Sequence, residues 1–157
     1  MPTNNSINLI KPIPRWFIYL ANTQANVLGG AVTYNYPFDT VLYAEGGVTY
    51  LSPSITIPTS GYYLINAGFK MSGLDATNTS VTMSFFIPTQ TIHMDDSGAV
   101  IRDAANSTSY SSSEITYLNA AETCHISSNV NGNVGVSLVG GAAPDYVTWF
   151  SGTFLYT

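Results

Sequence analysis

The chain of 157 residues carries very little charge. Asp, Glu, Lys and Arg together make up 8% of it, and the net charge is −5 at neutral pH, whereas charged residues form roughly 25% of an average soluble domain. Only four residues are basic, and two of them, Lys11 and Arg15, lie near the start. A nucleic-acid-binding surface needs clustered Lys and Arg to neutralise phosphates, so no nucleic-acid partner is expected.

Long hydrophobic runs are also missing, although 45% of the residues are hydrophobic. The longest run, Trp16 to Ala21, is far shorter than the ~20 residues of a membrane-spanning helix, so no membrane partner is expected. The first five residues lack the basic and then apolar pattern of a secretory signal. The single cysteine, Cys124, allows no disulfide within the chain and gives no sign of an oxidising compartment.

Helical periodicity is absent as well, because no window repeats apolar residues at i, i+3, i+4 and i+7 for long enough. Short β-rich runs separated by turn residues take its place, and residues 81–87 alternate as a strand does. Loops or turns are expected at 73–79, 95–98 and 104–113. The runs expected as strands are 16–21, 27–34, 40–43, 48–51, 54–57, 62–71, 81–87, 91–94, 114–118, 124–130, 134–139 and 146–156. Short strands at this spacing predict an all-β sandwich or barrel.

Residues 1–14 differ in composition from the rest, with three prolines and four separated apolar side chains, Ile7, Leu9, Ile10 and Ile13. Proline disfavours helices and central strands, so this segment is predicted to be an extended arm. The arm is either a loose terminus or an anchor whose apolar side chains dock on a neighbour. Residues 15–157 have the length of one domain, and we find no internal repeat in them.

Four segments, in this order and spacing, resemble the C1q/TNF-like jelly-roll family: Trp16–Leu20, Phe38–Tyr43, Gly61–Ile65 and Phe150–Tyr156. They match an aromatic first strand, a Phe-x-x-Val-Leu-Tyr segment, a Gly-x-Tyr strand and a closing Phe-x-Gly strand. The chain departs from the family pattern at Ala44, where Asn or Asp is usual, and at Ile65, where the family has Phe.

The resemblance implies an antiparallel jelly-roll β-sandwich of about ten strands that assembles as a homotrimer. In the family, the first, central and last strands lie side by side and pack around a threefold axis. It therefore implies that Tyr19, Tyr63, Phe154 and Tyr156 lie at a trimer interface. The residues alone leave a second interpretation open, in which these rings fill the sandwich of each protomer.

Constellations that would carry catalysis are not found. Cys124 and His125 are adjacent on an expected strand, where neighbouring side chains point to opposite faces, and no Gly-x-Ser-x-Gly elbow or phosphate-binding loop is present. His93, Asp95 and Asp96 could come close together, but Ca²⁺ takes about six to eight oxygen ligands. The two acids are better explained as turn residues. We expect a non-enzymatic protein with no cofactor and no metal.

Animal C1q-like proteins, which this sequence resembles, usually carry a signal peptide and a collagen-like or coiled-coil stalk, whereas this sequence begins with a methionine and a short apolar arm. The combination favours a structural protein that decorates or cements a larger particle, such as a phage or virus capsid or fibre, so that it would be located in the virion. The alternative is a module that recognises a receptor or carbohydrate at a fibre tip, on a bacterial cell surface or in the extracellular medium. Loops 73–80 and 104–113, rich in Asn, Ser and Thr, would then bind the ligand.

Overall fold

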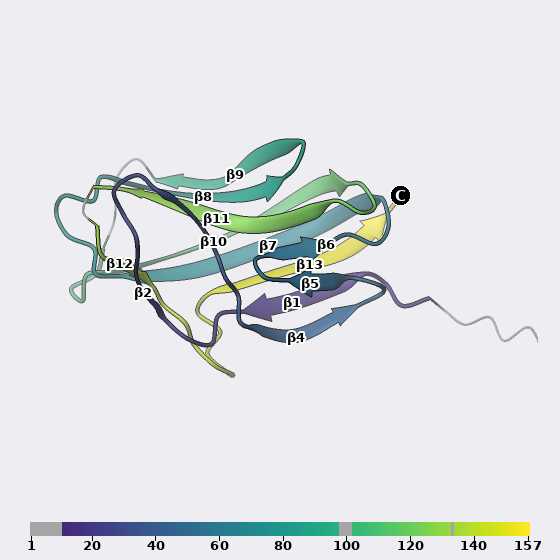
Figure 1. The fold of residues 1–157 in the computed structure, drawn as a ribbon, viewed down its shortest axis with the longest axis horizontal. Helices are drawn as coiled ribbons and strands as arrows, with labels where there is room; N and C mark the ends of the chain where they lie inside the picture. The colour runs from purple at the N-terminus through teal and green to yellow at the C-terminus, as the bar shows by residue number, and fades with distance from the viewer. Residues whose placement is uncertain (1–10, 98–101, 133) are drawn as a thin grey trace, which may run out of the picture.

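The computed structural model describes residues 11–97, 102–132 and 134–157, and in these ranges it consists of thirteen β-strands joined by turns and loops (Figure 1). No helix is found in this part of the chain, and therefore no helical membrane span. The all-β prediction is confirmed. The strands are β1 Arg15–Tyr19, β2 Gln24–Leu28, β3 Thr33–Asn35, β4 Thr40–Glu45, β5 Thr49–Leu51, β6 Ser54–Thr56, β7 Gly61–Ser72, β8 Ser80–Ile87, β9 Gln90–Ser97, β10 Ser107–Leu118, β11 Thr123–Asn131, β12 Val136–Leu138 and β13 Trp149–Tyr156.

Two antiparallel sheets form the sandwich. The seven-stranded sheet has the order β2-β12-β7-β13-β1-β4. Its seventh strand, β10, pairs with β7 over the whole length of both strands, on the edge opposite to the one that β12 and β13 share. The six-stranded sheet has the order β5-β6-β11-β8-β9, with β3 beside β11. The first and last strands lie next to each other, with Arg15 opposite Thr153, so β13 joins β1 to β7 (Figure 1).

Alternation along the strands decides which side chains fill the space between the sheets. In β7, Tyr63, Ile65, Ala67, Phe69 and Met71 are buried, while Tyr62, Leu64, Asn66 and Lys70 alternate with them and are more exposed. A strand points successive side chains to opposite faces, so one face of β7 supplies the core and the other is left as surface.

Aromatic rings make up much of the core. The Trp16 ring lies 5.5 Å from Phe150 and 6.1 Å from Tyr63, measured between ring centroids. Gly152, on the strand beside Trp16, leaves room for the indole, because a Cβ at this position would lie 2.2 Å from the ring. The Gly in the closing segment is therefore needed for packing against the first strand.

Three expectations about local structure are wrong. Residues 104–113 were expected as a loop, but β10 begins at Ser107, because β7 offers a partner for all twelve of its residues. Asp95 to Ser97 end β9 instead of forming a turn. The single strand expected over 27–34 is divided into β2 and β3 by Gly29 and Gly30, which both have positive φ.

Candidate functional site

The outer face of the seven-stranded sheet carries exposed aromatic side chains at one end. Tyr62 on β7 lies between Tyr117 on β10 and Tyr156 on β13, at ring-centroid distances of 5.3 and 5.0 Å. The three rings, here called the tyrosine cluster, are 38%, 45% and 56% exposed, and the exposed Ile115 precedes Tyr117 by two residues on β10. Clustered exposed apolar surface of this kind marks an interaction site in many proteins.

A second group of rings, half-buried, continues along the same face over β1. Phe17 stacks on Trp149 with centroids 5.8 Å apart, and Tyr19 meets the edge of Tyr146 at 4.8 Å. Gly68 makes room for this group, because a Cβ there would lie 2.8 Å from Nε1 of Trp149. These rings contact one another within the protomer and form a second group of aromatic side chains on the outer face of this sheet.

The prediction that Tyr63 lies in a trimer interface is contradicted by its position in the protomer. Its side chain is 0% exposed and its hydroxyl donates a hydrogen bond to the carbonyl of Thr59 at 2.7 Å. Burial raises the pKa of Tyr63 to about 12. With two tyrosines in succession, the sequence did not show which one faces outward, and the strand turns Tyr62 to the surface instead.

The other three predicted interface residues lie at different depths. Tyr156 belongs to the tyrosine cluster, and Tyr19 belongs to the half-buried group. Phe154 is half-buried, and its ring packs on Tyr63 of the same protomer at a centroid distance of 5.3 Å. Sequence reasoning missed Tyr62 and Tyr117. Alternation counted from the buried Ile65 would have pointed to Tyr62.

Two contacts fix the end of the predicted arm on the domain. The carbonyl of Pro14 accepts a hydrogen bond from the backbone N–H of Phe154 at 2.9 Å. Gly46 has a φ of +65°, and a Cβ on it would lie 2.4 Å from the backbone nitrogen of Pro14. Ile13, one of the four predicted anchoring residues, is exposed. Ile7, Leu9 and Ile10 lie outside the described residues.

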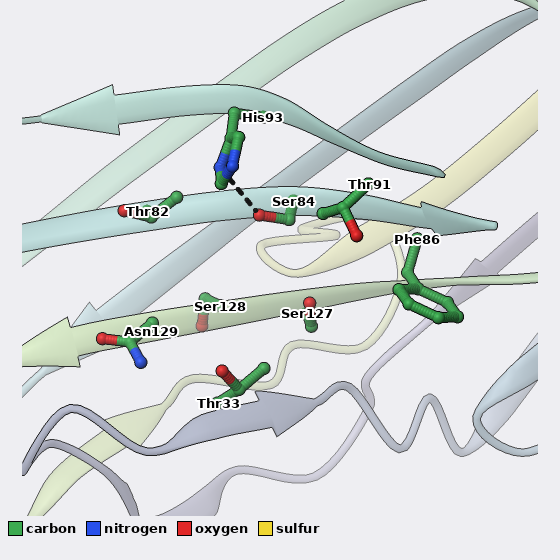
Figure 2. A pocket seen from close by; sticks show the side chains of 9 residues that line it. All are labelled: Thr33, Thr82, Ser84, Phe86, Thr91, His93, Ser127, Ser128 and Asn129. Carbon is green, nitrogen blue, oxygen red and sulfur yellow. Dashed lines mark hydrogen bonds between the residues drawn. The ribbon is translucent and has the colours of Figure 1, made fainter. Parts of the chain in front are cut away.

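The outer face of the six-stranded sheet has a hollow of about 480 Å³, here called the polar groove (Figure 2). Cross-strand rows build it: Asn129 of β11 lies opposite Thr82 of β8, and Ser127 of β11 lies opposite Ser84 of β8. Strands β9 and β3 form its two sides. The residues that line it are Thr33, Thr82, Ser84, Phe86, Thr91, His93, Ser127, Ser128 and Asn129.

Two side-chain contacts organise the polar groove. The hydroxyl of Ser84 lies 3.3 Å from Nδ1 of His93, in hydrogen-bond contact (Figure 2). At one end, the ring of Phe86 stacks on His125 with centroids 4.7 Å apart and planes 27° from parallel. Partial burial lowers the pKa of His125, so this imidazole is neutral at pH 7. The stacked pair therefore presents an uncharged aromatic surface.

The groups considered for catalysis are separated. Cys124 is fully buried, and burial raises the pKa of its thiol, while His125 lies on the outer face. In the described ranges no three His, Cys, Asp or Glu side chains come close enough to share a metal ion. The side chains of Asp95 and Asp96, considered with His93 as possible ligands, lie outside what the structure describes. Ser84 and His93 form a hydrogen-bonded pair on the outer face of the six-stranded sheet.

Comparison with known proteins shows the fold. No family model matches the sequence, and no curated protein matches it. Crystal structures of murine APRIL do match: the one at pH 8.0 superposes with a TM-score of 0.61 at 11% identity, covering 90% of this chain and 98% of that chain. The one at pH 5.0 gives 0.59 at 11% identity, covering 91% and 99%, and the one at pH 8.5 gives 0.59 at 13%, covering 90% and 98%. The chain thus has the TNF-like jelly-roll fold that the four sequence segments had indicated.

Proposed function

We propose that this protein is a non-enzymatic homotrimer that decorates or cements a larger particle, such as a phage or virus capsid or fibre, and that residues 1–14 anchor it there. Its location would then be the virion. The tyrosine cluster is the observation that carries the proposal. Three aromatic rings held together on the surface of a chain with 8% charged residues are suited to contact with further copies.

The chemistry of this face supports the proposed subunit contact. Tyr and Trp are enriched in the centres of protein interfaces, because they bury a large ring and keep a hydroxyl or N–H for a partner. The half-buried group around Phe17 and Trp149 adds to the apolar area. The number three comes from the resemblance to the C1q/TNF-like family, whose domains pack corresponding strands around a threefold axis.

The arm leaves the domain at the end of the sandwich where the tyrosine cluster lies. Pro14 is bonded to Phe154, two residues before Tyr156, and a Cβ on Gly61, beside Tyr62, would touch both Phe154 and Tyr156. A trimer assembled through this face would present three arms on one side. Three weak attachments act together with much higher avidity than one, so a short apolar arm suffices as an anchor.

The trimer is tested by measuring the native mass of the full chain in solution, beside Tyr62→Glu and a matched control, Leu51→Glu. Both positions are exposed, but Leu51 lies on β5 in the other sheet. We expect the unchanged chain and the control to have the mass of three chains, and Tyr62→Glu to have the mass of one, because a charge would be buried at the interface. A monomeric unchanged chain would overturn the trimer.

Attachment is tested on virus or phage particles purified from the source culture, with an antibody raised against the protein. We expect the antibody to label the particles. Added protein should bind particles that lack it, and replacement of Ile7, Leu9 and Ile10 by Ser should abolish this binding. A control with residues 3–5 changed to Ala should bind unchanged, because the polar segment is not the anchor. Absence of the protein from every particle fraction would refute the decorating function and leave the trimer intact.

A further inference from the structure

The polar groove on the six-stranded sheet has a lining of one chemical kind. Of its nine lining residues, six carry hydroxyl groups, and the others supply one amide, one imidazole and one phenyl ring. None of them carries a fixed charge. A surface with many donors and acceptors and no net charge is complementary to a neutral ligand that itself carries many hydroxyl groups.

The floor of the groove is withdrawn from solvent. Ser84 is 8% exposed and Ser127 is 5% exposed, although both side chains point to the outer face of the sheet. The hydroxyl of Ser84 is bonded to His93, whereas that of Ser127 makes no hydrogen bond to another described residue. A hydroxyl held in a hollow without a partner is ready to exchange a hydrogen bond with a ligand.

An aromatic surface borders this floor. Phe86 is half-exposed and lies two residues after Ser84 on β8. Its ring stacks on that of His125 in the neighbouring strand. Sugar rings have an apolar face of C–H groups that packs on aromatic rings, and a polar edge of hydroxyls. The groove offers the corresponding two surfaces side by side (Figure 2).

From this arrangement we propose that the polar groove is a binding site for a neutral saccharide. The sugar ring would pack on Phe86, and its hydroxyls would bond to Ser84, Ser127 and Asn129. A volume of about 480 Å³ falls within the roughly 300–1,000 Å³ of small-ligand sites. The site differs from the loops 73–80 and 104–113 that the sequence indicated. It belongs to the single protomer, and its operation does not depend on the proposed trimer.

The test is a titration of the ¹⁵N-labelled full chain, followed by NMR, with neutral mono-, di- and trisaccharides of gluco, galacto, manno, fuco and N-acetylhexosamine configuration. We expect at least one of them to shift the amide resonances of Ser84, His93 and Ser127, with a Kd of about 1 mM or tighter. Monovalent sugars are used so that avidity does not enter. Failure of the entire panel to shift these resonances would overturn the proposal.

Two variants and two controls locate the binding. Ser84→Leu fills the hollow and Phe86→Ala removes the aromatic surface, and each should weaken binding by about tenfold or more. Thr49→Leu and Leu51→Ala make comparable changes on β5, outside the groove, and should bind as the unchanged chain does. Phe86 is half-exposed, so its truncation leaves the core in place even if Ser84→Leu fails to fold. Undiminished binding by Phe86→Ala would place the sugar elsewhere and refute the proposal.

Discussion

At the scale of single residues, the closing Gly shows how the first and last strands fit together. Gly152 lies opposite Trp16 in the sheet, and the indole ring occupies the volume in which any side chain at 152 would lie. The sequence showed a glycine recurring beside aromatics in this strand. What it did not show was which ring takes the space, because Trp16 is 136 residues away along the chain and only the strand pairing brings it there.

We expect Gly152→Ala to destabilise the protein by roughly 3 kcal/mol, because the added methyl group would overlap the Trp16 ring in a closely packed core. Urea denaturation followed by fluorescence measures the change. Ser151→Ala, one residue earlier and on the outer face, is the control and should change stability by less than about 0.5 kcal/mol. Equal effects of the two substitutions would show that the indole does not occupy the position described.

Asp39 makes stability depend on pH. Burial acts to raise its pKa, but hydrogen bonds from the backbone of Ala21 and from Asn22 and Thr40 outweigh it, so the pKa lies below its ordinary value of 3.8. A lowered folded-state pKa means that the ionised carboxylate stabilises the fold. This contribution is complete above pH 3.8 and is lost as the pH falls through the lower folded-state pKa.

Denaturation of the unchanged chain and of Asp39→Asn should therefore show a stability difference that shrinks as the pH falls below 3.8. Thr40→Val removes one donor and should reduce the pH dependence without abolishing it. A difference that stays constant from neutral pH into strong acid would contradict the assignment of these bonds to the ionised form.

At the scale of elements, sequence reasoning succeeded where apolar and polar residues alternate strictly. Residues 81–87 were predicted as a strand and form most of β8, and 62–71 lie within β7. It failed at Ser107 to Ser113, because Ser and Thr favour turns as readily as the outer face of a strand. The partner decides between the two, and twelve consecutive residues of β7 pair with β10.

Amide hydrogen exchange distinguishes the strand from the loop that the sequence suggested. A strand paired on one side directs alternate N–H groups toward its neighbour, so we expect protected and unprotected amides to alternate from 107 to 118. The unprotected amides of β10 are the internal control. Uniformly fast exchange over 107–113 would show that this segment is a loop and contradict its assignment to β10.

At the scale of the whole molecule, the fold could be predicted and the polar groove could not. Four short segments in the right order sufficed for the jelly roll, because each strand carries its own pattern. The groove combines one residue of β3 with three of β8, two of β9 and three of β11, and its Ser and Thr are the same residue types that made 104–113 look like a binding loop. Only the register of four strands makes these residues into one surface.

Assembly should also be visible in thermal stability. Because association stabilises the folded state by mass action, the Tm of the proposed trimer should rise with protein concentration. The Tm of Tyr62→Glu should be independent of concentration, and that of Leu51→Glu should follow the unchanged chain. Differential scanning calorimetry at protein concentrations that span about two decades measures this dependence of the Tm. If the Tm of the protein without substitutions stayed the same at all protein concentrations, this would argue against any concentration-dependent assembly.

The position of β13 between β1 and β7 has a consequence for how the protein is made. During translation β1, β4 and β7 emerge well before Trp149–Tyr156, the strand that bonds to both β1 and β7. Until that strand has left the ribosome, the pair β1-β4 is separated from the strands around β7. The ring of Trp16 also lacks its contact with Phe150. Folding of this sheet is therefore completed only after synthesis of the domain, and its closure depends on contacts far apart in sequence, which form slowly.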